Sequence, residues 1–226
     1  MYIPVRSALG ATGSPPPFDA SVERWRSRVA AAAGDLPVDF LLAWIQRESD
    51  GNPCSYTSMH ESGIFQLMPP DNMITGGTTE AALRPACSGQ SATRSFTNAE
   101  LDEQVRSGIR YVRAMRDVVR KKLAKTGVNW SESSPDFWRV VKLQHAYPGP
   151  TEAWLAGARA ALGRAPATWA EMRSTISGYA TVLNNAEWVG GFGGGGGSAS
   201  SGSTVKLVII LGTLAALATM ALRHPR

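Results

Sequence analysis

Cysteine and histidine are scarce in this chain of 226 residues, and their scarcity excludes two kinds of site. The only cysteines, Cys54 and Cys87, allow one intramolecular pairing and cannot support a disulfide-built scaffold. Two buried free thiols and one loop-closing disulfide remain equal alternatives. The redox compartment of the protein would decide between them, and the sequence does not fix that compartment. The histidines His60, His145 and His224 lack the spacing of metal ligands. We therefore expect neither a metal nor a cofactor.

The sequence also lacks any run in which basic and aromatic residues alternate. A formal charge of +5 and a pI near 9.5 favour an anionic partner, which could be nucleic acid, a lipid surface or the bacterial wall polymer. The densest basic segment, residues 116–122, has the spacing of a solvent-exposed helix face. We therefore do not expect nucleic acid to be the partner.

The two ends of the chain differ from its middle. Residues 1–18 contain three consecutive prolines, lack the apolar core of an export signal and are expected to form an N-terminal arm. Residues 190–204 are rich in glycine and serine, which predicts a flexible linker. Residues 205–223 contain an uncharged apolar run between cations and are expected to form a single transmembrane helix, followed by a short tail at 224–226. A buried core helix is the less favoured alternative for this run.

The remaining residues, 19–189, are expected to form one mainly α domain. Apolar residues make up 43% of the chain and charged residues 18%, and apolar positions recur with helical spacing. A few short strands could lie within residues 70–97. Helices are predicted over 21–33 before Gly34, from Pro37 onward, from a cap at Asn98, and after Pro135, Pro150 and Pro166.

One carboxylate falls on an apolar helix face. In the helix from Pro37, Glu48 follows Leu41 by seven residues and Ile45 by three, so it shares their stripe. Burial disfavours a charged carboxylate and raises its pKa, which suits a general acid. The alternative is a glutamate at a helix end that bends out to water.

The residues around Glu48 carry a family resemblance. The segment ESDGNP at 48–53, followed by SGIFQLMP at 62–69, resembles the soluble lytic transglycosylase family, whose pattern is ES, then NP, then a GLMQ-like segment ending in MP. Three further segments follow in the family's order, at 101–115, 145–150 and 176–183. The resemblance covers roughly residues 36–183 and implies a lysozyme-like domain, similar to goose-type lysozymes.

The resemblance also implies roles for individual residues. Glu48 would be the catalytic acid and base, with Tyr147 hydrogen-bonded to it. Met68 would border the saccharide groove through its backbone. Ser49 and Gln66 would hold the carboxylate or the sugar. The implied substrate-binding residues are Ser49, Gly63, Gln66, Met68, Tyr147 and Tyr179. A glycine at position 63 would let the backbone approach the substrate closely.

The implied reaction is that of a polysaccharide lyase: cleavage of the β-1,4 bond between N-acetylmuramic acid and N-acetylglucosamine in peptidoglycan, with formation of a 1,6-anhydro ring. This reaction needs one carboxylate, whereas glycosidases ordinarily use a pair. A lysozyme-type hydrolase is the runner-up and would need Asp50, Glu61 or Asp71 as a second acid. A turnover-deficient peptidoglycan-binding module is the third alternative, because Pro148 replaces the family's usual asparagine.

The predicted helix near the C-terminus bears on location. A wall-cleaving domain tethered to a membrane would open the wall only near that membrane. We expect the partners to be peptidoglycan glycan strands and the membrane itself. The expected setting is the membrane of a bacteriophage particle at genome entry, among other virion proteins. The alternative is the periplasmic face of a bacterial inner membrane, within a secretion or conjugation apparatus.

Overall fold

The computed structural model describes residues 18–58, 60–68 and 95–194. The helices in these ranges are α1 (Ala20–Glu23), α2 (Arg26–Ala33), α3 (Val38–Ser49), α6 (Asn98–Thr126), α7 (Pro135–Ala146), α8 (Pro150–Leu162), α9 (Trp169–Ser174) and α10 (Ala180–Gly190). Within the same ranges, extended pairing is limited to isolated bridges among Tyr56, Ser62 and Leu67. The expected mainly α class is thus confirmed. Of residues 70–97, where short strands were expected, 70–94 lie outside the described residues, and 95–97 contain no strand.

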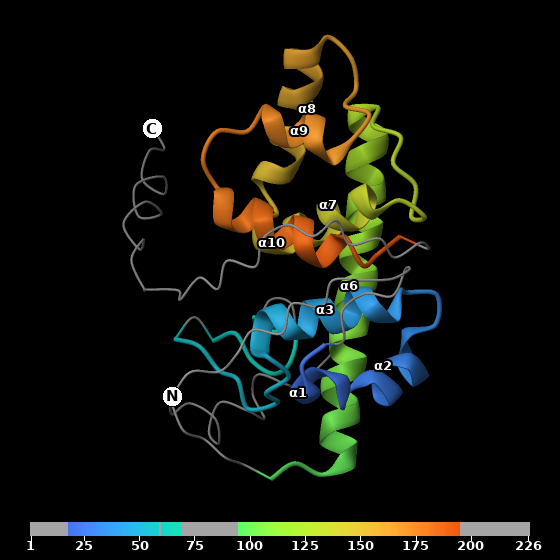
Figure 1. The fold of residues 1–226 in the computed structure, drawn as a ribbon, viewed down its shortest axis with the longest axis vertical. Helices are drawn as coiled ribbons and strands as arrows, with labels where there is room; N and C mark the ends of the chain where they lie inside the picture. The colour runs from blue at the N-terminus through green and yellow to red at the C-terminus, as the bar shows by residue number, and fades with distance from the viewer. Residues whose placement is uncertain (1–17, 59, 69–94, 195–226) are drawn as a thin grey trace, which may run out of the picture.

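The long helix α6 organises the fold. It runs along the length of the molecule, with α1, α2 and α3 against one half and α7 to α10 against the other (Figure 1). Helix α10 packs along α7 and also contacts α3, while α2 contacts both α3 and α6. Helix α3 therefore lies where the two halves meet.

The ends of the helices follow from local chemistry. Helix α6 begins with a capping box in which the Thr97 hydroxyl accepts from the Glu100 amide and the Glu100 carboxylate accepts from the Thr97 amide. The cap expected at Asn98 is therefore one residue earlier. Helix α2 ends at Gly34, whose φ of 61° confirms the predicted glycine stop.

Two helices predicted as continuous are interrupted. The segment 21–33 breaks between α1 and α2 at Trp25, which is buried and donates through its indole nitrogen to the Gly51 carbonyl at 3.0 Å. The segment after Pro166 breaks between α9 and α10, where Gly178 and Tyr179 have φ of 77° and 58°. Left-handed residues cannot continue a right-handed helix, so the chain turns there.

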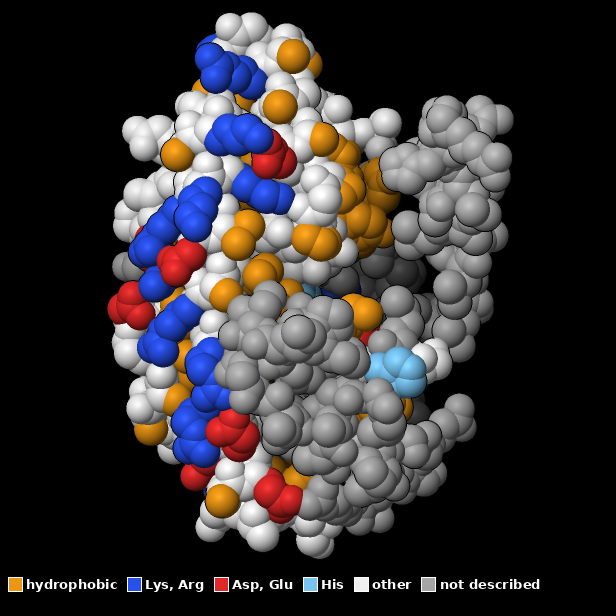
Figure 2. Space-filling view, turned by 180° about the vertical axis from the view of Figure 1, so that it is seen from behind, with side chains coloured by type: hydrophobic (Ala, Val, Ile, Leu, Met, Phe, Trp, Pro, Cys, Tyr) orange, Lys and Arg blue, Asp and Glu red, His pale blue; other side chains and the backbone are white. Residues whose placement is uncertain are grey.

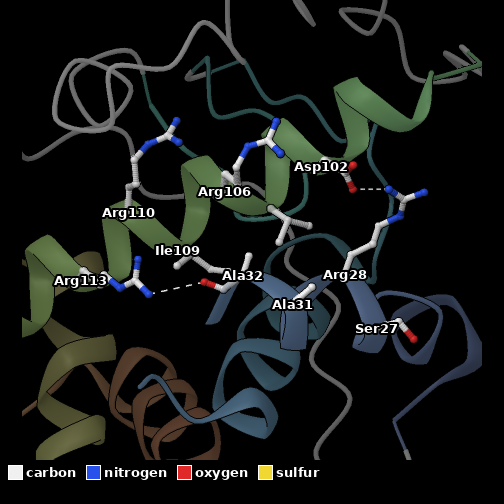
Figure 3. A pocket seen from close by; sticks show the side chains of 10 residues that line it. Ser27, Arg28, Ala31, Ala32, Asp102, Arg106, Ile109, Arg110 and Arg113 are labelled. Carbon is white, nitrogen blue, oxygen red and sulfur yellow. Dashed lines mark hydrogen bonds and ion pairs between the residues drawn. The ribbon is translucent and has the colours of Figure 1, made fainter. Parts of the chain in front are cut away.

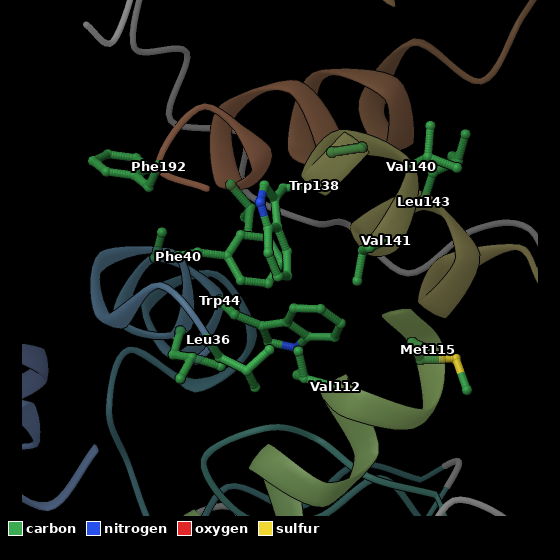
Figure 4. Close-up of a cluster of buried hydrophobic side chains, with 14 of the residues drawn as sticks. Leu36, Phe40, Trp44, Val112, Met115, Trp138, Val140, Val141, Leu143 and Phe192 are labelled. Atoms are coloured by element: carbon green, nitrogen blue, oxygen red, sulfur yellow. The ribbon is translucent and has the colours of Figure 1, made fainter. Parts of the chain in front are cut away.

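The core joins α3, α6 and α7 through fully buried aromatic and aliphatic side chains (Figure 4). Phe40 and Trp44 of α3 face Trp138 of α7, and the Phe40 and Trp138 ring centroids are 4.8 Å apart. Val112 of α6 closes the cluster. Rings of this size each bury roughly 150–250 Å². This packing fixes the relative positions of the three helices that carry the candidate site.

The packed domain extends past its expected end. Helix α10 reaches Gly190, and Phe192 is buried with its ring centroid 5.3 Å from that of Phe18. A Cβ on Gly193 would fall 2.0 Å from Trp138, so only glycine fits there. Residues 190–194 thus belong to the domain, which shortens the predicted linker.

The rest of the predicted linker and the predicted membrane helix at 205–223 lie outside the described residues. Among the helices that are described, none combines the length and the apolar character needed to cross a membrane.

Candidate functional site

Glu48 lies in the last turn of α3, directly after the buried run from Phe40 to Ile45. The helix ends at the next residue, Ser49, and Asp50, with a φ of 49°, turns the chain away. The Glu48 side chain is 21% exposed, so it is half-buried and still reaches the surface.

Two cationic or polar side chains of α7 contact this carboxylate. The Lys142 ammonium donates to Glu48 Oε1, and the lysine side chain is only 4% exposed. The Nε2 atom of His145 lies 3.6 Å from the same oxygen, and its Nδ1 atom is 3.0 Å from the Tyr111 hydroxyl of α6. The Trp44 ring lies beneath them, with Lys142 Nζ 4.2 Å from its centroid. These five residues form the candidate site.

The electrostatics of the site differ from the sequence-based expectation. Burial raises the pKa of Glu48, as expected, but the charge and hydrogen bond of the Lys142 ammonium and the nearby His145 ring together outweigh burial. The net pKa of Glu48 is therefore well below its ordinary value, and the predicted rise is wrong. The cause is a neighbouring cation that the helical pattern around Glu48 does not reveal.

The opposite balance applies to Lys142. Burial lowers the pKa of its ammonium group, and the Glu48 carboxylate restores only part of that loss. A buried lysine beside a carboxylate can release a proton to it more readily than a solvated lysine can.

A tight loop after α3 supports the site. The amide of Ser62 donates to the Leu67 carbonyl at 3.1 Å, and the Leu67 amide donates to the Ser62 carbonyl at 3.0 Å. Between them the chain reverses through Gly63 and Gln66, whose φ values are 73° and 49°. The left-handed conformation at position 63 therefore favours glycine.

Ser49 and Gln66 use their hydrogen bonds within the protein. The Ser49 hydroxyl contacts the carbonyls of Ile45 at 3.1 Å and Ile64 at 2.9 Å, which ties the loop to α3. The Gln66 amide donates to the carbonyls of Ser55 and Gly63, and its side chain is buried. Both residues shape the loop, and neither bonds to Glu48. Met68 is half-buried at the end of the described loop.

The loop is also fastened to α6. The Ile64 amide donates to the Gln104 side-chain oxygen at 3.2 Å, and the Gln104 amide group donates to the Pro53 carbonyl at 3.1 Å. Phe65 packs so closely on Gly108 that a Cβ there would fall 2.0 Å from the ring. The glycine of the segment at 101–115 thus has a packing role.

The predicted tyrosines lie together, although not in the predicted contact. Tyr147 directly follows α7, and its ring centroid is 5.3 Å from that of Tyr179 and 5.9 Å from that of Trp154. Tyr179 is 49% exposed. Among the described residues, no hydrogen bond joins Tyr147 to Glu48; the contacts of this carboxylate with Lys142 and His145 are made through Oε1. We call Tyr147, Trp154 and Tyr179 the aromatic cluster.

At position 148, where the resembled family usually has asparagine, the carbonyl of Pro148 makes the hydrogen bonds that hold the turn. The Pro148 carbonyl accepts from the Lys122 ammonium at 2.6 Å and from the Gln144 amide at 3.5 Å. The turn between α7 and α8 is therefore held in place without an asparagine side chain.

The possible second acids differ in their surroundings. Glu61 accepts from the Thr57 hydroxyl at 2.9 Å, and its charge raises the pKa of Lys142. Asp50 is exposed at the end of α3, and Asp71 lies outside the described residues. Of the two candidates that the structure describes, Glu61 is thus the one that acts electrostatically on Lys142.

The structure decides between a free thiol and a disulfide at Cys54. Cys54 is disulfide-bonded. Cys87, the other cysteine of the chain, lies outside the described residues.

Sequence reasoning missed four of the five residues of the site, namely Lys142, His145, Tyr111 and Trp44. A usable signal was present, because Lys142 stands between Val141 and Leu143 in an apolar helix and three residues before His145. A lysine in such a position is either buried against a partner or extended along the surface. Sequence alone does not identify the partner, since Glu48 lies on another helix.

Comparison of the chain with protein-family models, with curated proteins and with solved structures finds no match.

Proposed function

We propose that the chain is a peptidoglycan lytic transglycosylase with a lysozyme-like domain, which cleaves the β-1,4 bond between N-acetylmuramic acid and N-acetylglucosamine. The observation that carries the proposal is the half-buried Glu48 carboxylate, held by side chains of α7 at the position that the family resemblance assigns to the catalytic residue. The aromatic cluster supports it, because Tyr179 is exposed while Tyr147 and Trp154 are half-buried, and such rings offer apolar faces on which sugars can pack.

The reaction begins with Glu48 ionised and paired with Lys142. Binding of the glycan strand excludes water, and in a drier site the separated charges become less favourable than a neutral pair. A proton then moves from Lys142 Nζ to Glu48 Oε1, which leaves a neutral amine and a carboxylic acid. Glu48 becomes a general acid only when substrate is present.

Bond cleavage and ring closure follow from that state. Glu48 gives its proton to the glycosidic oxygen as the bond from that oxygen to C1 of the muramic sugar breaks. The resulting carboxylate takes the proton from the C6 hydroxyl, and the C6 oxygen bonds to C1 to form the 1,6-anhydro ring. The proton on Glu48 then returns to Lys142, and no water is consumed.

The ion pair also favours a second candidate function. A carboxylate held ionised by a buried ammonium is not ready to donate a proton, so a peptidoglycan-binding module without turnover would have the same resting geometry. The lysozyme-type alternative rests on Glu61 as the second acid.

The proposed location is a membrane, with the domain on the side that faces the wall. The uncharged run within 205–223 supports the anchor, and the disulfide at Cys54 fits an oxidising compartment. A bacteriophage membrane at genome entry is the preferred setting, and a secretion or conjugation apparatus is the other.

Release of soluble fragments from purified peptidoglycan separates an enzyme from a binding module. The wild-type chain should solubilise the wall, while Glu48→Gln should bind the wall and release nothing above background. Equal wall binding by both proteins without release by either would favour the module and refute the enzyme.

A further inference from the structure

An imidazole connects Glu48 to a buried tyrosine of another helix. The Nδ1 atom of His145 lies 3.0 Å from the Tyr111 hydroxyl, and its Nε2 atom lies 3.6 Å from Glu48 Oε1. Tyr111 is 3% exposed and the His145 side chain 12%. The imidazole therefore bridges a hydroxyl of α6 and the carboxylate of α3, and none of the proposed proton transfers uses it.

Two aromatic rings hold this imidazole in one orientation. The Tyr111 ring meets it edge to face, with centroids 5.5 Å apart and planes at 81°. The Trp44 ring also contacts it, at 4.9 Å between centroids. Rotation of the imidazole would have to displace one of these rings in a closely packed interior. The Nε2 atom of His145 is therefore kept toward Glu48.

The tyrosine also decides which ring nitrogen carries the hydrogen. A neutral imidazole has one hydrogen, on Nδ1 or on Nε2. If Nδ1 carried it, the lone pair of Nε2 would face the anionic carboxylate of Glu48 and be repelled by it. If the Tyr111 hydroxyl donates to Nδ1, the hydrogen is on Nε2 and points at Glu48, which is the favourable arrangement. Tyr111 thus selects the form in which His145 is a donor toward Glu48.

We propose that His145, oriented by Tyr111, is a positioning residue that donates through Nε2 to the Glu48 carboxylate while Lys142 is a neutral amine. The inference rests on the proposed function. In that reaction the proton of Lys142 passes through Glu48 to the glycosidic oxygen before the C6 hydroxyl is deprotonated. During that interval Glu48 is again a carboxylate, and Lys142 no longer offers it a positive charge. A donor that keeps its own hydrogen stabilises the carboxylate and holds it in place for the second proton transfer.

The distance of 3.6 Å is consistent with this order of events. It is too long for a hydrogen bond in the resting site, where the Lys142 ammonium donates to the same oxygen. Once that ammonium has lost its proton, the carboxylate is free to move toward His145, and catalytic contacts commonly tighten in this way when substrate is bound. His145 neither gains nor loses a proton, so the proton count of the proposed reaction is unchanged.

The arginines of α6 are turned away from this carboxylate. On the face shown in Figure 2, Lys and Arg side chains form a column along the length of the molecule. Figure 3 shows three arginines that project from α6 beside α2, namely Arg106, Arg110 and Arg113. Tyr111 lies about 100° or more around α6 from each of them and reaches His145 on α7 instead. Within the described part of the chain, the side chains that contact the Glu48 carboxylate are Lys142 and His145, so His145 is the donor that remains when Lys142 is neutral.

Nitrogen NMR of the imidazole tests its orientation in the full chain, held in detergent micelles. The chain has three histidines, so isotope-labelled histidine gives few ring signals, and those of His145 are the ones missing from His145→Gln. At about pH 8, where an ordinary imidazole is neutral, the wild type should carry its hydrogen on Nε2. Tyr111→Phe should give a mixture of the two neutral forms. A wild-type ring with its hydrogen on Nδ1, or with hydrogens on both nitrogens, would overturn the selection by Tyr111 and with it the proposal.

The rate of cleavage of soluble glycan strands tests the role of His145 in the reaction. Tyr111→Phe keeps the ring but loses the hydroxyl, and kcat should fall roughly tenfold while KM changes by less than about twofold. His145→Leu removes the donor, and kcat should fall roughly 100-fold. His145→Gln places an amide hydrogen near the same oxygen and should recover most of that loss. A residue that only supports the fold would neither lower kcat alone nor be rescued in this way.

A second pair of tyrosine and histidine gives the matched control. The Tyr56 hydroxyl lies 2.7 Å from His60 Nδ1, which is the same kind of contact. In the described part of the chain, His60 makes neither a hydrogen bond nor an ion pair with Glu48. Tyr56→Phe should therefore leave kcat unchanged, and equal losses in Tyr56→Phe and Tyr111→Phe would refute the positioning role.

The remaining outcomes separate this inference from the proposed function. If the wild type cleaves no glycan strand, the proposed enzyme and the positioning role fail together. If the wild type cleaves the strand and kcat is unchanged in Tyr111→Phe and His145→Leu, the positioning role alone fails. A loss in His145→Leu that His145→Gln does not recover would show that the shape of the ring matters and not its hydrogen, which also refutes the role.

Discussion

The Lys142 ammonium lies between the Glu48 carboxylate and the face of the Trp44 ring. It donates to Glu48 Oε1 and sits 4.2 Å from the ring centroid, so its charge is stabilised on both sides. This arrangement joins α3 to α7 and holds Glu48 ionised. Lys142 therefore has a structural effect and a chemical effect, and the two can be measured separately.

Removal of the ammonium should destabilise the fold. In Lys142→Met the side chain keeps its length and its contact with Trp44, but the half-buried Glu48 carboxylate loses its cation. We expect a loss of about 3 kcal/mol in the free energy of unfolding at pH 7. Lys121→Met, at an exposed position of α6, should change it by less than about 0.5 kcal/mol. Chemical denaturation of the two variants makes the comparison, and equal small losses would show that the ion pair contributes nothing.

Acid should weaken the wild-type fold through Glu48. Its folded-state pKa lies below the unfolded value of about 4.5, so its contribution is complete above about pH 5 and is lost as pH falls toward 2. The contribution is at most about 3 kcal/mol. In Glu48→Gln this part of the pH dependence should disappear, and the slope of stability against pH between 5 and 2 should be smaller. An unchanged slope would mean that the pKa of Glu48 is not depressed.

Substitution of Gly108 should destabilise the fold through steric overlap with a neighbouring side chain, although alanine has the higher helix propensity. A methyl group there would fall 2.0 Å from the Phe65 ring, so Gly108→Ala should destabilise the fold by about 1–3 kcal/mol and shift the loop at 62–67. Gly157 lies within α8 with nothing inside 4 Å of an added Cβ. Gly157→Ala should therefore stabilise the fold by about 0.5–1 kcal/mol. Thermal unfolding of the two variants measures both changes in stability. Changes of the same sign in Gly108→Ala and Gly157→Ala would contradict the packing account.

The aromatic cluster should contribute to glycan binding. Loss of one ring in Trp154→Ala or Tyr179→Ala should raise KM for soluble glycan strands roughly two- to tenfold with a smaller change in kcat. Trp188 is also exposed, but it packs on Phe192 instead, with ring centroids 5.2 Å apart. Trp188→Ala should leave KM unchanged, and a similar effect in all three variants would remove the cluster from the proposed site.

The helices were largely predictable because their signals are local. Pro135 and Pro150 begin helices where expected, and Gly34 ends one, since each residue fixes its own backbone geometry. The break at Tyr179 was not predictable, because a tyrosine with φ of 58° is held there by its surroundings and not by its own preference.

Only those features of the site that depend on α3 alone were predictable from the sequence. The position of Glu48 at the end of an apolar stripe gave its partial burial correctly. Its ionisation depends on Lys142, which lies on α7 and reaches it only through the packing of Trp44 against that helix. Residue spacing within one segment does not predict a pKa that depends on contacts between distant segments.

Mass spectrometry of the fragments released from purified peptidoglycan tests the central claim most directly. Transglycosylation by Glu48 predicts fragments that end in 1,6-anhydromuramic acid, lighter by one water than hydrolysis products, and it predicts that Glu48→Gln releases none. Fragments with reducing muramic acid ends, or anhydro fragments released equally by Glu48→Gln, would contradict it.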